Sequence, residues 1–264
     1  MDPPTGRFGL LQPAQAPAPA LPEASASSTS VTTDGRMRTP DYTLGAALAT
    51  CYTPRAVSPT EDVLDFWFAE PSVDAEALQR NMRRWYGSAP DMDDKIANRF
   101  GEAVERALRG ELSAWAAEPR GRLALILVLD QFPRNLFRNT ARAFLGDPAA
   151  QRLALEAVDG RLDAGLTVDQ RTFLVTPLLH AEDLALQERS VAEIERIVAD
   201  VPEHLTPFYS MGVEQSLKYR EVIRRFGRFP HRNESLSRPS TPQEIEFLKD
   251  WKHRMAPRGA PAAG

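Results

Sequence analysis

The sequence predicts an all-helical protein: one domain that folds as an irregular bundle of helices, preceded by an extension that is not part of the fold. Helix-capping patterns recur from Ser58 onward. Between them, apolar residues repeat at intervals of three and four, and no segment reads as a strand with a pairing partner. We therefore expect a helical domain over residues 58–255.

The first 57 residues differ in composition from the rest. They hold eight of the 22 prolines and the polar run Ser25–Ser30. A segment with so few large apolar residues cannot bury enough apolar surface to offset the conformational entropy lost on ordering. We therefore predict disorder for residues 1–57 and for the tail 256–264. The extension is Ser-rich and acidic-poor, which also fits a transit peptide or an export signal. The simpler interpretations are an unstructured extension, or a start codon assigned too early, with Met37 as an internal start.

Net charge and cysteine content suggest a cytoplasmic protein. The charge is −4, which argues against a nucleic-acid-binding surface spread over the whole domain. The longest apolar run, Leu123–Leu129, is too short to span a membrane. The single cysteine, Cys51, lies in the extension and excludes an intramolecular disulfide, as suits a reducing compartment. The oligomeric state is left open.

Capping and helix-ending residues place the first helices. Ser58-Pro59-Thr60-Glu61 combines a cap, a proline at the first helical position and a glutamate at the third. Apolar residues at helical spacing then run from 92 to 108 after Pro90, and Gly110 closes that helix. Residues 123–129 are apolar on every side, which predicts a central buried helix.

The second half of the domain carries similar signals. Asp147-Pro148 starts a helix, Pro177 is expected to kink or split the next one, and the helix with Pro207 in its first turn ends at Gly227. Three further capping boxes are indicated, at Thr167 with Gln170, Ser190 with Glu193, and Thr241 with Glu244.

A polar segment, residues 130–138, follows directly on the most apolar stretch. Such side chains are costly to desolvate unless they pair with each other or with a ligand. Pro133 interrupts the helical hydrogen bonds near Leu129, and Arg134 or Asn135 could supply the missing donors. The segment is either an internal ion-pair network or part of an anion pocket. The candidate ligand-binding residues here are Asp130, Gln131, Arg134, Asn135 and Arg138.

A second polar segment surrounds His180. At helical spacing His180, Asp183 and Gln187 share a face, while Glu182 points away. A carboxylate next to a histidine fixes its tautomer and makes it a general base. A metal site is disfavoured, because the four histidines have no companion ligand motif at a diagnostic spacing. We take His180, Asp183 and Glu182 as candidate catalytic residues, and Gln187 as ligand-binding.

The third segment is the most basic. Residues 214–238 carry seven basic and three acidic side chains. Basic residues before Gly227 complement the helix dipole, but those after it need another explanation. Aromatic and basic mixtures also bind single-stranded nucleic acid, which the acidic remainder of the domain disfavours. Phe226, Phe229 and Pro230 would anchor this loop. The candidates are Arg225, Arg228, Arg232 and Asn233 for ligand binding and His231 for catalysis.

These segments together resemble the bacterial domain-of-unknown-function family 924. The resemblance runs from about Val63 to Leu248, in matching order. It rests on Phe66-Trp67-Phe68, Pro119–Ile126, Asp130–Asn135, His180 with Glu182-Asp183 and Gln187–Ser190, and Arg225–Asn233. It implies an all-helical fold of the tetratricopeptide-like superfamily, and no established reaction, substrate or cofactor.

Three positions depart from the family pattern. Ala181 stands where a serine usually follows the histidine, Tyr219 where a histidine usually precedes the Arg-rich helix end, and Ser237 where a glycine usually follows the asparagine. If a serine or histidine at those places takes part in chemistry, this member has altered or lost it.

Two functions remain at the level of the sequence. In the first, the three segments converge on a pocket for a small anionic molecule, with Arg134, Arg228 and Arg232 holding the anion and His180 or His231 as acid–base group. In the second, the polar segments are an internal scaffold and a groove binds a peptide, as tetratricopeptide-like proteins do. No nucleophile motif, phosphate loop or cofactor fingerprint is present, so cofactor and enzymatic activity stay open.

Overall fold

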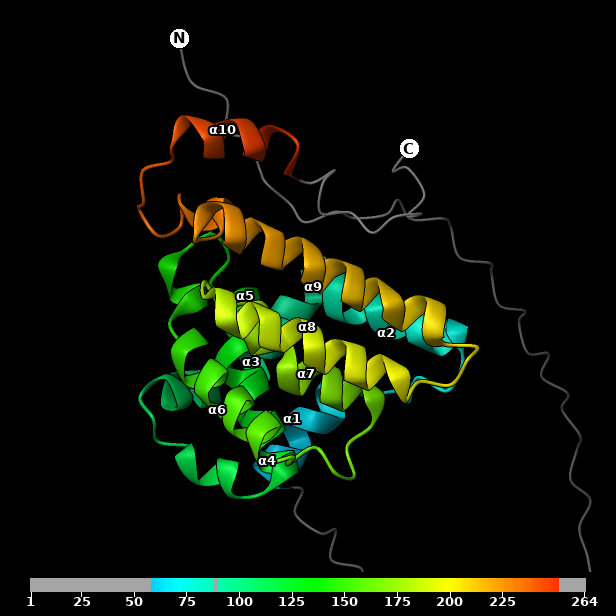
Figure 1. Cartoon of the computed structure of the whole chain (residues 1–264). Coiled ribbons are helices and arrows are strands. Elements are labelled where there is room, and N and C mark those ends of the chain that lie inside the picture. Colours follow the sequence, from blue (N-terminus) through cyan, green and yellow to red (C-terminus); the bar gives the residue numbers. More distant parts are fainter. Residues whose placement is uncertain (1–57, 88–89, 252–264) are drawn as a thin grey trace, which may run out of the picture. The chain divides into compact units, whose positions relative to one another are not determined.

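The computed structural model describes residues 58–87 and 90–251, and every described element is helical (Figure 1). The disorder predicted for residues 1–57 and 256–264, the start at Met37 and Cys51 lie outside the described residues. The helices are α1 Pro59–Trp67, α2 Ala75–Tyr86, α3 Pro90–Leu108, α4 Pro119–Ile126, α5 Phe132–Leu136, α6 Asp147–Asp159, α7 Val168–Leu179, α8 Leu184–Ala199, α9 Thr206–Phe226 and α10 Pro242–Lys249. Short turns of other helix types are Ser113–Ala117, η2 Leu127–Gln131, Ala141–Phe144 and η4 Pro230–Arg232.

The all-helical prediction is confirmed, since the described ranges contain no strand. Within the same ranges, no helix combines the length and apolar character needed to cross a membrane. Consecutive helices α6 to α9 each pack against the next, and α8 and α9 run antiparallel side by side (Figure 1). The tetratricopeptide-like assignment remains a prediction.

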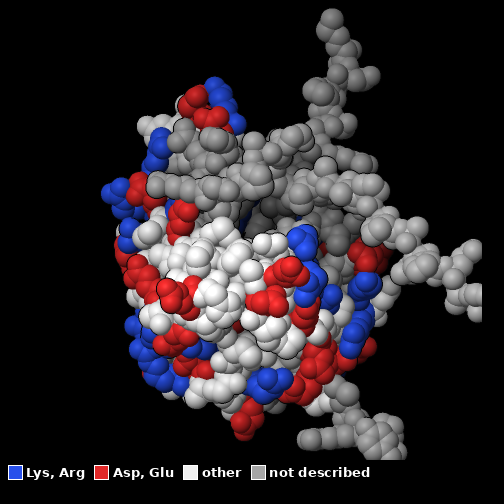
Figure 2. Space-filling view, turned by 90° about the vertical axis from the view of Figure 1, so that its right-hand side faces the viewer, with Lys and Arg blue, Asp and Glu red and all other residues white. Residues whose placement is uncertain are grey.

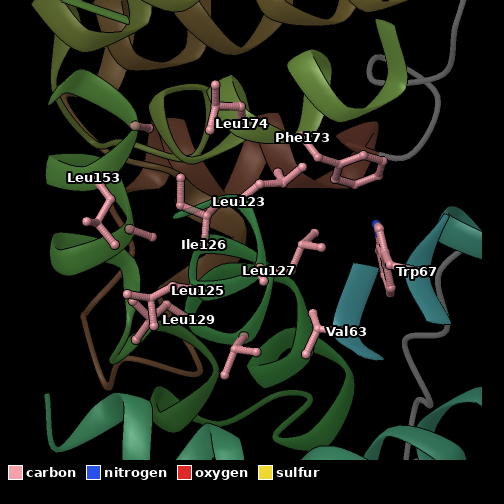
Figure 3. Close-up of a cluster of buried hydrophobic side chains, with 14 of the residues drawn as sticks. Val63, Trp67, Leu123, Leu125, Ile126, Leu127, Leu129, Leu153, Phe173 and Leu174 are labelled. Atoms are coloured by element: carbon pink, nitrogen blue, oxygen red, sulfur yellow. The ribbon is translucent and has the colours of Figure 1, made fainter. Parts of the chain in front are cut away.

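The apolar run 123–129 forms the centre of the core. Leu123, Ile126 and Leu127 are fully buried, and Figure 3 shows them between Leu153 on one side and Val63 on the other. Because this helix is surrounded, it needs no polar face, and the prediction of a central buried helix is confirmed. Aromatic side chains from α1, α3, α5 and α7 complete the core through edge-to-face and tilted ring contacts.

Helix starts follow the predicted caps with one exception. The side chain of Ser58 accepts from the backbone of Glu61, and both Thr167 and Thr241 form complete capping boxes. The predicted capping box at Ser190 is wrong, because this residue lies inside α8, which Asp183 caps instead.

Two further expectations differ from the structure. Pro177 does not split α7, which continues past it for two residues to Leu179, while the alternative expectation of a kink stays a prediction. The sequence analysis also missed α2, a polar helix capped by the side chain of Asp74.

A second, smaller core holds the C-terminal segment. Phe229 and Phe247 pack with Val222 and Ile223 of α9, while Phe226 lies partly buried against them. Phe229 and Pro230 are buried, so the predicted anchoring of the loop after Gly227 is confirmed. Gly227 itself has φ +69°, the left-handed conformation that lets a glycine end α9.

The helix α6 begins in close contact with η2. A Cβ atom added at Gly146 would lie 2.1 Å from the carbonyl oxygen of Leu129, which is backbone and cannot move aside cheaply. Only glycine permits this approach, and it places Asp147, the first residue of α6, beside α5.

We therefore expect Gly146→Ala to lower the free energy of unfolding by about 2 kcal/mol, the usual cost of forcing extra atoms into a packed interior. The matched control is Gly101→Ala in α3, where an added Cβ meets nothing within 4 Å. This control should be neutral or stabilising by up to about 1 kcal/mol, since alanine is the better helix former. Urea denaturation followed by circular dichroism measures both. Equal stability of the two variants would show that the contact has no energetic weight.

Candidate functional site

The candidate site starts at the π-helical turn η2, between α4 and α5. The backbone N–H of Phe132 bonds to the carbonyl of Leu127, one residue further back than in an α-helix. Pro133 has no N–H, so the chain here lacks a donor, and the guanidinium of Arg134 donates to the carbonyl of Asp130 at 2.6 Å. The donor is one that the sequence predicted, although the acceptor lies one residue later. Such π turns are frequent at functional sites.

Asp130 and His180 form a buried pair. The carboxylate of Asp130 has no exposed surface and lies 2.9 and 3.0 Å from Nδ1 of His180, the residue that ends α7. Burial favours the neutral acid, but Arg134 and His180 outweigh it and hold the pKa of Asp130 below its usual range. An ionised carboxylate can only accept, so Nδ1 of His180 carries the proton.

His180 itself is uncharged at neutral pH. Burial and the charge of Arg134 lower the pKa of its imidazole, and Asp130 only partly offsets them. Because Nδ1 donates to Asp130, Nε2 keeps its lone pair. The side chain is 16% exposed, so the cluster reaches the surface here.

Arg134 joins this pair to α6. Its Nη1 and Nη2 each lie 2.9 Å from an oxygen of Asp147, and Nη1 also lies 3.1 Å from Asp130. Burial raises the pKa of Asp147 and Arg134 only partly counteracts it. Oδ2 of Asp147 accepts a hydrogen bond from Nη2 of Arg134, whereas Oδ1 lies within ion-pair distance of Nη1 but accepts no hydrogen bond.

Arg232 has no such commitment. Its side chain is 7% exposed, and its one ion-pair contact is 3.5 Å long, from Nη1 to Asp147. Nε is buried without a hydrogen-bond partner. The guanidinium carbon lies 4.5 Å from the ring centre of Phe229 and 4.9 Å from that of Phe144. Burial and Arg134 lower its pKa to about 10, so Arg232 stays charged at neutral pH with little compensation.

His231 lies next to Arg232 on η4, but it faces an apolar environment. Its ring stacks on Trp251 at 4.3 Å and packs against Phe229, and its Nδ1 is buried without a partner. Burial and the charge of Arg232 lower its pKa to about 3. The structure thus assigns His231 to the packing of the C-terminal core and not to the Asp130–His180 pair.

The predicted partner of His180 is wrong. The chain after His180 turns instead of continuing as a helix, so His180, Asp183 and Gln187 share no helical face. The carboxylate of Asp183 caps α8 by accepting from the N–H of Leu186. The carboxylate that orients His180 comes from Asp130, fifty residues earlier.

Most other predicted site residues are bonded to groups outside the predicted set. Glu182 accepts from the N–H of Phe229 and from both terminal nitrogens of Arg238. Arg228 was expected to hold an anion, but its Nε and Nη2 donate to the two carboxylate oxygens of Glu244, and Nη2 also donates to the carbonyl of Pro239. Of the remaining candidates, Asn135 and Arg138 donate to Asp93, and Gln131 donates to Asp130. Gln187 donates to the carbonyls of Leu179 and Ala181, just after α7, and Asn233 donates to Ser240. Arg225 is exposed, with its guanidinium over the ring of Phe226.

Asp147 belongs to the site, although no pattern in the sequence predicts it. It reads as an ordinary acidic residue at a helix start, which stabilises the helix dipole on its own. The local signal that could have singled it out is Gly146 before it, a glycine where the chain passes close to another backbone.

Charges on the surface are mixed. On the face shown in Figure 2, Lys and Arg lie among Asp and Glu, so this face presents no field of one sign for a nucleic acid. Within residues 58–87 and 90–251, no group of three or more histidine, cysteine or carboxylate side chains is placed to hold a metal ion.

Fold and site together define a class: a helical protein whose core helix ends in a buried cluster of two carboxylates, two guanidinium groups and one imidazole. Residues 63–251 match the model of the family described as bacterial protein of unknown function, DUF924. The chain belongs to this family.

One solved structure supports the same conclusion. A protein of unknown function from Agrobacterium tumefaciens is 34% identical, with a TM-score of 0.60 over 72% of this chain and 97% of that one. No curated protein matches the chain.

The three departures from the family pattern lie in different surroundings. Ala181 is fully buried and its carbonyl accepts from Gln187. Tyr219 packs its ring on Phe229 and lies close enough to Arg232 to interact with its charge. Ser237 has φ +52°, a conformation that glycine adopts without strain, which gives a backbone reason for the usual glycine.

The depressed pKa of His231 predicts a loss of stability in acid. The unfolded histidine takes up a proton near pH 6.5 and the folded one does not, so stability is full above that pH and falls as the pH drops below it. Between pH 7 and pH 5 this costs about 2 kcal/mol. In His231→Phe, which keeps the ring contact with Trp251, that part should disappear. Urea denaturation at the two pH values measures the difference, and an equal loss in both proteins would contradict the assignment.

Proposed function

We propose that this protein binds a small anionic molecule at the cluster of Arg232, Arg134 and His180, and that His180 is its acid–base group. The observation that carries the proposal is Arg232: a charged guanidinium whose side chain is 7% exposed and whose one ion-pair contact in the described residues is 3.5 Å long. Buried charges are ordinarily paired, and an unsatisfied one calls for a missing partner. An anion beside Nε would supply it.

The pair Asp130–His180 supports acid–base chemistry at the same place. Its carboxylate orients the imidazole and its Nε2 is the end free to accept a proton. Asp130 takes the positioning role that we first expected of Asp183 or Glu182. His231 has no part in the proposal, because its ring is stacked against Trp251.

The alternative, a peptide-binding groove, has less support. It needs a continuous exposed apolar surface. The large apolar side chains that are exposed in the described residues are single ones on different elements: Val73, Tyr86, Leu145, Leu184, Leu217 and Ile245. Isolated exposed apolar residues are normal on a protein surface.

The role of Asp130 can be tested through the tautomer of His180. We expect nitrogen NMR at pH 7 to find His180 neutral, with the proton on Nδ1. In Asp130→Asn the amide can donate as well as accept, so this preference should weaken or reverse. His204, whose ring is not bonded to a carboxylate, is the internal reference and should not change. A His180 tautomer that is the same in both proteins would exclude the positioning role.

The anion site can be tested with Arg232→Met, which keeps an apolar stem against Phe144 and Phe229. In a thermal-shift panel of small carboxylates and phosphates, a ligand at 100 times its dissociation constant should stabilise the unaltered chain by about 2.7 kcal/mol. Arg232→Met should abolish this stabilisation while the ligand-free protein stays at least as stable, since a poorly compensated buried charge has gone.

The matched control is Arg228→Met, four residues earlier, where Nε and Nη2 already donate to Glu244 and to a backbone carbonyl. This variant should lose stability without ligand and keep the ligand-dependent shift. The opposite pattern would leave Arg232 as a structural residue only.

A further inference from the structure

The surroundings of Arg232 narrow the chemistry of the anion. We propose that the ligand is a carboxylate, held side-on at the Nε edge of Arg232 with the adjoining part of the molecule facing His180. This inference rests on the anion site proposed above and adds to it the class of ligand.

The free hydrogen-bonding position on Arg232 has a shape that a carboxylate fits. The rings of Phe229 and Phe144 pack against the guanidinium, with its central carbon 4.5 and 4.9 Å from their centres. Nη1 faces Asp147, and Nε is the buried donor without an acceptor. A carboxylate is planar and matches a guanidinium edge with two parallel hydrogen bonds. A phosphate can also bind such an edge through two of its oxygens, so the choice between the two anions depends on charge.

The charges of the cluster favour a monoanion. The formal charges of Asp130, Asp147, Arg134 and Arg232 sum to zero, but both carboxylates lie against Arg134, so the positive charge with little compensation is that of Arg232. A monoanion adds one negative charge to a site where burial already raises the pKa of the Asp147 carboxylate. A phosphate dianion adds two, with no further cation to meet the second. Burying that charge without a partner is costly.

The neighbouring charged groups do not alter this balance. Glu182 and Arg238 lie close to the cluster, but they form a two-pronged ion pair with each other. Tyr219 stays neutral, because burial raises the pKa of its hydroxyl.

The exposure of the three side chains indicates how a ligand reaches Arg232. The side chains of His180 and Arg134 are 16% and 21% exposed, whereas Arg232 is 7% exposed. His180 and Arg134 are thus nearer to the surface than Arg232, and we place the approach of the ligand on their side. A carboxylate that reaches Arg232 from there leaves its substituent next to Nε2 of the imidazole.

The test is a titration of the full chain, labelled with nitrogen-15, against sodium acetate and against sodium phosphate. Each salt replaces sodium chloride at constant ionic strength, and the imidazole signals of the four histidines are followed. We expect acetate to shift the His180 signal saturably, with a dissociation constant at least tenfold below that for phosphate. Acetamide, which has the shape of acetate and no charge, should leave the signal unshifted.

Arg232→Lys separates the planar fork from the charge. We expect it to weaken acetate binding at least tenfold and to change phosphate binding less than twofold, because lysine keeps the charge but has no edge for a carboxylate. Arg228→Lys, on the same segment, should leave acetate binding unchanged. The comparison of acetate, acetamide and phosphate uses the unaltered chain, so it decides the ligand class even if a variant misfolds.

Phosphate that binds as tightly as acetate would overturn the carboxylate assignment and leave the anion site standing. Acetamide that binds as well as acetate would overturn it too, since the site would then not read charge. If neither anion gives a saturable shift at His180, the carboxylate assignment and the proposed function both fail.

Discussion

The burial of one carboxylate constrains the rest of this structure. Asp130 follows the most apolar helix of the chain and has no exposed surface, so water cannot stabilise its charge. Arg134 and His180 supply the compensation. Because they sit on α5 and at the end of α7, the charge can be buried only if these helices meet the core helix at that point. The core thus fixes the position of the site, and the electrostatics of the site help to fix the packing of the helices.

The order of the contacts follows from the backbone. Pro133 removes an N–H, η2 takes up the irregularity, and Gly146 lets α6 start against that turn. Both oxygens of Asp147 then lie 2.9 Å from Arg134, whereas the contact of Asp147 with Arg232 is 3.5 Å long. The poorly compensated guanidinium is therefore a consequence of local geometry and not of a shortage of acidic residues in the chain.

The sequence was sufficient for what depends on neighbours along the chain. Caps, helix ends and the buried helix 123–129 were predicted, because capping and apolar periodicity are local. Contacts between residues far apart in the sequence were not predicted. Asp183 is close to His180 in sequence, but a cap requires it elsewhere, and no local pattern selects Asp130 instead. Asp147 was missed for the same reason.

Two arginines of one loop show what separates a scaffold from a candidate site. Arg228 and Arg232 both follow Gly227, and the sequence treats them alike. Arg228 meets Glu244 in a two-pronged pair and donates to a carbonyl as well, so its charge is fully used inside the protein. Arg232 is more buried, and it has one long contact and a donor without an acceptor. A purely structural network would be expected to compensate the more buried charge better, because desolvation costs it more. The reverse is found, next to an oriented imidazole, and a ligand that completes the pairing accounts for both observations.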